Sequence, residues 1–302
     1  MSEMLDLNTS TETVLSEEPK RNPGLLQIVS LLCACAVISQ ISVILIAKGL
    51  PGNYSGKTFL WVQSIGQILQ QLAVMKLAVC GVFDFDGVFC IDRTTQLSCK
   101  FSQYATYLVF VLPDFLAVPV SLDRLNAVLF PAWYSQKCTK TSAWKIIVPI
   151  VFATACLASP KFLFAEKIGE NCFNTNRKYD QTSALVGIPA VLIVAVSTLA
   201  LLGIMLARVK KSQQSSEMRN QKPITIALAG SSTVFAAFGS IQYTILFLAY
   251  LWRDFNNPKN TLILMGMAQI VGSIGIMLRS PILLFMKPMR AALKRAITTC
   301  NK

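Results

Sequence analysis

The sequence predicts an all-α integral membrane protein, a seven-transmembrane helix bundle with a short C-terminal amphipathic helix. Hydrophobic residues make up 53% of its 302 residues, charged residues only 14%, and the apolar residues gather in seven long runs. A soluble domain carries about 25% charged residues. Each run has close to the roughly 20 residues that a helix needs to cross a bilayer. Spanning strands would be about half as long and would alternate strictly, which argues against a barrel.

The seven runs set the expected transmembrane spans, at about 24–47, 59–83, 98–127, 143–163, 182–207, 223–251 and 260–286. Residues 1–23 are polar and form an expected extracellular tail, with no signal peptide ahead of the first span. Residues 287–302 form an expected cytoplasmic amphipathic helix and tail on the inner membrane surface. Its apolar face holds Met289, Ala292, Leu293 and Ile297, and the opposite face holds Arg290, Lys294 and Arg295.

The lysines and arginines of the loops predict the orientation. Seven spans place the two termini on opposite sides, and most basic residues fall on one of them, with Asp123 and Glu217 as its only acids. Cytoplasmic loops carry such an excess, so the N terminus is expected outside and the C terminus inside. The excess of basic residues, which gives the chain its net charge of +13, then faces the anionic lipid of the cytoplasmic leaflet. We expect no nucleic-acid partner.

The composition also excludes several kinds of chemistry. The chain has no histidine, no glycine-rich phosphate loop of the GxxxxGK type and no HExxH motif. Histidine bases, Ser-His triads and histidine-type zinc sites are therefore absent. We expect no enzyme, no catalytic residue, no metal site and no cofactor.

The third span joins two chemically distinct ends. Cys99 precedes Arg124 by 25 residues, and Asp123 lies beside Arg124. A helix between them is about 37 Å long, which is the apolar bilayer core plus a margin at each face. One helix would thus place a cysteine at one face and an Asp-Arg pair at the other.

This third span resembles the third helix of rhodopsin-like (class A) G-protein-coupled receptors. Asp123-Arg124-Leu125 stands where that family has Asp-Arg-Tyr, Pro131 follows seven residues after Arg124, and Tyr134 follows where an aromatic residue is frequent. The resemblance implies that Arg124 pairs with Asp123 at rest and swings toward a G protein on activation. The alternative is an interfacial charge pair that anchors the helix.

The same resemblance implies two covalent features, and a sequon adds a third. Cys99 would bridge Cys172 of the longest external loop, although Cys90 is also external and could compete for it. Cys300, after the amphipathic helix, is a candidate for palmitoylation. Asn8 begins an Asn-Thr-Ser sequon and is a glycosylation candidate.

Other family motifs are altered, which marks a divergent member. Ser280-Pro281 begins a stretch that resembles the Asn-Pro-x-x-Tyr motif, so Ser280, Pro281 and Pro131 join Asp123 and Arg124 as candidate coupling-switch residues. The second span has Gln67, Gln70 and Gln71, and no acid, where the family has its sodium-binding acid. The sixth span lacks Trp and Pro within 235–241, and Ser39-Gln40 replaces the first-helix Gly-Asn pair.

Three ionisable residues are expected at membrane depth, where each costs about 2.5–3.5 kcal/mol on insertion scales. Lys76 would either attract an acidic ligand group or extend to the outer interface. Asp114 would be protonated, or paired with Lys76 or Arg279. Arg279 is expected to stabilise the bundle interior.

The resemblance also indicates a ligand pocket. The place of the aspartate in amine-binding members is Thr106 here, which argues against an aminergic receptor, and the seventh span has no lysine for a retinal Schiff base. The candidate pocket residues are Lys76, Gln103, Thr106, Tyr107, Gln242 and Tyr243.

The sequence therefore predicts a plasma-membrane receptor. It would bind an extracellular small molecule or peptide within the bundle and activate a heterotrimeric G protein. One alternative is a transporter or channel-like bundle that uses Lys76, Asp114 and Arg279 along a polar path. Another is a receptor remnant that no longer signals.

Overall fold

The structure is a computed structural model that describes residues 23–50, 55–83, 95–163, 165–168, 171–174, 216–253 and 258–300. It also describes 189, 192–193, 195–201, 203–204 and 207. These residues are almost entirely helical. Five segments are long and apolar enough to cross a membrane: Gly24–Gly49, Gln96–Ala127, Lys140–Leu163, Ile226–Ala249 and Ile263–Phe285. The predicted class, an all-α membrane bundle, is confirmed.

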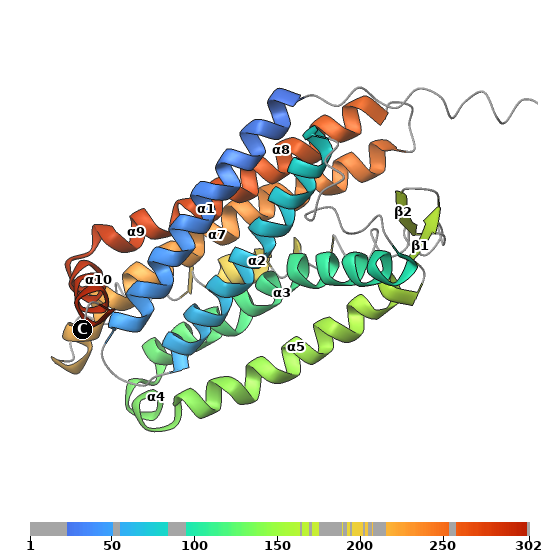
Figure 1. Cartoon of the computed structure of the whole chain (residues 1–302). Coiled ribbons are helices and arrows are strands. Elements are labelled where there is room, and N and C mark those ends of the chain that lie inside the picture. Colours follow the sequence, from blue (N-terminus) through green and yellow to red (C-terminus); the bar gives the residue numbers. More distant parts are fainter. Residues whose placement is uncertain are drawn as a thin grey trace, which may run out of the picture.

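The helices form two groups joined by α2. The elements are α1 (Pro23–Gly49), α2 (Ser55–Phe83), α3 (Gln96–Leu129), α4 (Pro131–Lys137), α5 (Lys140–Leu163), α7 (Ser216–Arg253), α8 (Pro258–Met277), α9 (Arg279–Phe285) and α10 (Lys287–Cys300). Figure 1 shows α1, α7 and α8 side by side, with α3 and α5 as a second pair. Helix α2 contacts both α1 and α3. Most of the expected span at 182–207 lies outside the described residues.

Helix α3 has a defined start and a bent middle. Thr95 caps it, since its side chain accepts from the Ser98 amide at 3.1 Å and its own amide donates to Ser98 Oγ at 3.2 Å. This capping box fixes Cys99 in the first turn. Pro113 and Pro119 lie inside the helix, which bends near its middle (Figure 1). A proline removes one helical hydrogen bond and its ring clashes with the preceding turn, which accounts for the bend.

The seventh span is interrupted at Leu278, between α8 and α9. Pro281 has no amide hydrogen, so the carbonyl four residues earlier, that of Met277, has no partner within the helix. Ser39 Oγ of α1 donates to this carbonyl at 2.8 Å, and Gln40 Nε2 donates to the Ile276 carbonyl at 3.0 Å. The first helix thus satisfies the backbone of the break, as a membrane interior requires.

Helix α10 packs against α1. Met289 and Ala292 are fully buried in a core cluster with Val43 and Ile46, while Ile297 is 48% exposed. The place of this helix on the inner membrane surface stays a prediction, but Met289 and Ala292 on its apolar face pack against α1. In the first half of α10, the apolar face is therefore covered by α1 and does not contact lipid.

A short hairpin, β1 (Ala165–Ile168) and β2 (Asn171–Asn174), follows α5 and was not predicted. The strands are antiparallel, with Lys167 opposite Cys172. Strand β1 contacts α3. The hairpin therefore lies against the helix that carries Cys99.

Candidate functional site

Four side chains meet where α2 begins and α3 ends, and we call them the Arg124 cluster: Ser55, Asp123, Arg124 and Tyr134. Arg124 donates to the Asp123 carboxylate through Nε at 3.0 Å and through its terminal nitrogen. Tyr134 donates its hydroxyl to Asp123 at 2.9 Å and accepts from Arg124. Ser55 donates to the other carboxylate oxygen. The charges of Asp123 and Arg124 are thus paired and hydrogen-bonded inside the protein, with both side chains 5% exposed.

Local structure brings Tyr134 back to the end of α3. The chain turns at Phe130, and α4 begins at Pro131, whose fixed φ and missing amide hydrogen suit a first helical position. One turn later Tyr134 reaches Asp123. The Ser55 amide donates to the Cys138 carbonyl at 3.0 Å, which ties the start of α2 to the end of α4.

The Arg124 cluster holds Tyr134 in its neutral form. Burial raises the pKa of the Tyr134 phenol, an effect that the positive charge of Arg124 partly offsets. The guanidinium carbon of Arg124 also lies 5.6 Å from the centre of the tyrosine ring, within cation–π range. Tyr134 therefore remains a hydrogen-bond donor to Asp123 across the physiological pH range.

A second polar group, the Arg279 cluster, joins three helices in the interior: Gln63, Gln67, Ser231 and Arg279. Arg279 is 0% exposed and donates to Gln67 Oε1, to Gln63 Oε1 at 3.0 Å and to Ser231 Oγ at 3.3 Å. Its guanidinium carbon lies 5.4 Å from the centre of the Phe235 ring. The expected place of Arg279 in the bundle interior is confirmed, and its stabilising role stays a prediction. All three oxygen acceptors are neutral, so dipoles and a ring face stabilise the charge.

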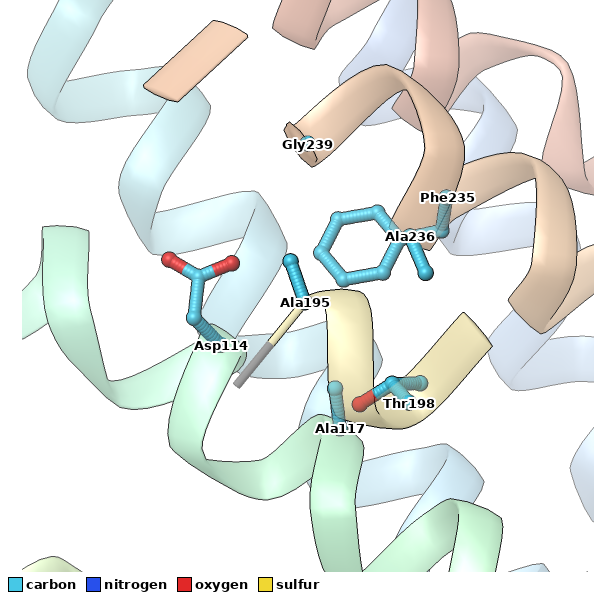
Figure 2. Close-up of a pocket in the computed structure, with 7 residues that line it drawn as sticks. All are labelled: Asp114, Ala117, Ala195, Thr198, Phe235, Ala236 and Gly239. Atoms are coloured by element: carbon cyan, nitrogen blue, oxygen red, sulfur yellow. The ribbon is translucent and has the colours of Figure 1, made fainter. Parts of the chain in front are cut away.

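Asp114 occupies a third polar position, on α3. Tyr243 of α7 donates a hydrogen bond to one of its carboxylate oxygens. The expected alternatives of an ion pair with Lys76 or Arg279 do not occur among the described residues. Figure 2 shows Asp114 at the edge of a hollow between α3, the fifth span and α7. The hollow is lined by Asp114, Ala117, Ala195, Thr198, Phe235, Ala236 and Gly239.

The six candidate pocket residues do not all come together. Tyr243 is buried beside Asp114 and has Tyr107 as an electrostatic neighbour. Gln242, in contrast, points at α8, where a Cβ on Gly272 would collide with its amide. The remaining candidates, Lys76, Gln103, Thr106 and Tyr107, are half-buried along α2 and α3.

Cys99 is fully buried and forms a disulfide. Cys33, Cys35, Cys138 and Cys156 are free. The side chains of Cys90, Cys172 and Cys300 lie outside the described residues, as does Asn8. The identity of the partner of Cys99 therefore stays a prediction.

Two of the other candidate switch residues, Ser280 and Pro281, lie near the break in the seventh span. Ser280 is 5% exposed in α9, and Pro281 beside it is exposed. Pro131 begins α4. Neither Ser280 nor Pro281 belongs to the hydrogen bonds of the Arg124 cluster.

Residues 53–296 match the model of the family described as serpentine type 7TM GPCR chemoreceptor Srv. The chain belongs to the Srv family. This makes the protein a multi-pass membrane receptor of the G-protein-coupled kind, with the seven-helix fold that the sequence predicts. Among curated proteins, none matches this Srv-family receptor. Membership identifies a serpentine chemoreceptor family, which is not specifically the rhodopsin-like class.

Sequence reasoning missed several partners in this Srv-family receptor. Neither Ser55 nor Ser231 was among the predicted site residues, although both donate to or accept from a charged side chain of a cluster. One signal was present: Gln63, Gln67 and Gln71 recur every four residues and therefore share one face of α2. A polar stripe within an apolar run indicates a buried polar partner.

Proposed function

We propose that this Srv-family receptor binds an extracellular ligand between its helices and activates a heterotrimeric G protein by a mechanism like that of rhodopsin-like receptors. The observation that supports this most directly is the Arg124 cluster. Its arginine lies at the end of the third span, paired with Asp123 and shielded by Tyr134. A buried, hydrogen-bonded guanidinium has a defined resting position, which ligand binding can disfavour.

In this proposal the cluster represents the resting receptor. Opening it would release Arg124 from Asp123 and Tyr134 and expose the guanidinium to a G protein. Three groups hold the Asp123 carboxylate, so the resting state is stabilised from α2, α3 and α4 together. The receptor would act in the plasma membrane with its N terminus outside, and the proposed Cys99–Cys172 bridge would hold the external loop against α3.

The proposed function is tested by G-protein activation in cells that express the full chain at the surface. Arg124→Ala should abolish the ligand-dependent response at unchanged surface expression. Lys145→Ala is the matched control, because it removes an exposed positive charge near the start of α5. The proposal fails if the Arg124→Ala receptor signals as strongly as the control. A folded wild-type receptor without signalling toward any ligand class would favour the receptor remnant instead.

A further inference from the structure

The hollow beside Asp114 combines a buried acid with unfilled space. Asp114 is 8% exposed, and Tyr243 engages one of its two carboxylate oxygens. No hydrogen bond joins the other oxygen to a described residue, and Asp114 is one of the residues that line the hollow. The hollow has room for roughly one water-sized group. A carboxylate at this depth is costly unless a donor or cation reaches it.

The rest of the lining selects the kind of group that fits. Ala117, Ala195 and Ala236 are apolar, and the Phe235 ring forms one wall (Figure 2). A ring face attracts a cation at close range. A hard metal ion needs about six oxygen ligands, whereas only Asp114 and Thr198 offer side-chain oxygens among these lining residues. An ammonium group is small enough for the hollow, carries a charge opposite to that of Asp114 and is attracted by the Phe235 ring face.

We propose that the hollow is the inner end of the ligand site and takes the protonated amino group of a small primary amine. This inference rests on the proposed function, because it names the ligand class of that receptor. The ammonium group would pair with the Asp114 oxygen that Tyr243 does not engage, while the Tyr243 hydroxyl keeps the other oxygen. Thr106, which stands at the place of the amine-binding acid in the resembled family, lies eight residues earlier on α3, so this site is a different one.

The position of the hollow also connects it to the receptor interior. Ser231, Phe235, Gly239 and Tyr243 recur every four residues and form one stripe along α7. Tyr243 binds Asp114, Phe235 and Gly239 line the hollow, and Ser231 binds Arg279. The Phe235 ring borders the hollow and also contacts the Arg279 guanidinium. An occupant of the hollow therefore touches a side chain that also contacts the Arg279 cluster.

The test measures binding without a G protein. The full-length receptor is purified into lipid nanodiscs, and its melting temperature is followed with propylamine and hexylamine against propan-1-ol and hexan-1-ol. The amines should raise the melting temperature and the alcohols should not. Asp114→Asn keeps the shape and the Tyr243 contact but removes the charge, and it should weaken amine binding about 10-fold to 100-fold.

Two further variants keep the test decisive if Asp114→Asn does not fold. Tyr243→Phe removes the hydroxyl that partly neutralises the Asp114 carboxylate and should tighten amine binding. Gly239→Ala should weaken it, since the added Cβ meets no atom within 4 Å and only narrows the hollow. Gly230→Ala is its control on the same helix, with its nearest atom at an ordinary 3.7 Å. Equal effects of amines and alcohols, or amine binding unchanged in these variants, would overturn the inference. Because no G protein is present, that result leaves the signalling test unaffected.

Discussion

The Ser39 hydroxyl donates a hydrogen bond of 2.8 Å to the Met277 carbonyl, the oxygen that Pro281 leaves without a helical partner. A hydrogen bond from a side chain to the backbone thus joins the first and seventh spans, between residues 238 positions apart in the sequence. Polar residues that satisfy a proline break make the break tolerable inside a membrane.

Ser39→Ala should lower the unfolding free energy by about 1–3 kcal/mol, the cost of an unsatisfied buried acceptor. Thermal unfolding of the purified receptor measures it. Ser42→Ala is the matched control, because Ser42 only bonds the Ile38 carbonyl of its own helix at an exposed position. Equal losses in the two variants would contradict the role assigned to Ser39.

Tyr134→Phe should raise ligand-independent G-protein activation roughly fivefold to tenfold, because about 1–1.5 kcal/mol of resting-state hydrogen bonding is lost. The ring stays, so its contact with the Arg124 guanidinium stays as well. Basal nucleotide exchange in membranes measures the change. Tyr104→Phe serves as control, since Tyr104 makes an edge contact with the Phe162 ring far from the cluster. An unchanged basal rate in Tyr134→Phe would contradict the resting-state assignment.

Gly56→Ala should have a related effect by a steric route. A Cβ at Gly56 would overlap the Arg124 guanidinium and come within 2.8 Å of the Asp123 carboxylate. The flexible end of Arg124 would have to leave its paired position, so basal activation should rise several-fold. At Gly203 a Cβ meets nothing within 4 Å, which makes Gly203→Ala the control. Basal activation as low as that of the control would show that Arg124 does not need this space.

Gln67→Glu should raise the melting temperature, because it gives the buried Arg279 guanidinium an acidic partner in place of a neutral one. Arg279→Ala should lower the melting temperature. In the Arg279→Ala background, Gln67→Glu should no longer stabilise the receptor, which corresponds to a coupling energy of about 1–3 kcal/mol in a double-mutant cycle. Gln70→Glu should destabilise, since Gln70 donates to the Phe110 carbonyl at 3.4 Å and a carboxylate cannot donate. Additive effects of the Gln67 and Arg279 changes would contradict a direct interaction.

Cys172→Ser should destabilise the receptor as much as Cys99→Ser, and the double variant should lose no more than either single variant. The reason is that one bridge is removed in all three, at a typical cost of about 2–5 kcal/mol. Melting curves of the purified variants decide the pairing. If Cys90→Ser shows this behaviour instead, Cys90 is the partner of Cys99.

The sequence predicted the helical membrane fold because apolar length is a local property of the chain. It also predicted the buried place of Arg279, since the cost of a charge at that depth is local too. The partners could not be predicted in the same way. Ser231 and Gln63 are 48 and 216 residues from Arg279, and their contacts depend on how each helix is rotated in the bundle.

In the Arg124 cluster, too, one contact could be predicted from the sequence and the others could not. The Asp123–Arg124 pairing follows from adjacency at a helix end and was expected from the sequence. Tyr134 reaches it only because α4 turns the chain back at Pro131, and Ser55 arrives from another helix. Turn geometry and helix docking are set by the whole structure.

The burial of Met289 and Ala292 against α1 has a practical consequence for studies of this receptor. Shortening the chain at Met286 would remove Met289 and Ala292 and uncover the apolar side chains of Val43 and Ile46. Affinity tags and fluorescent fusions should therefore be attached after Lys302. A C-terminal truncation that reduces signalling would report on lost folding of the receptor as much as on lost contacts with a G protein.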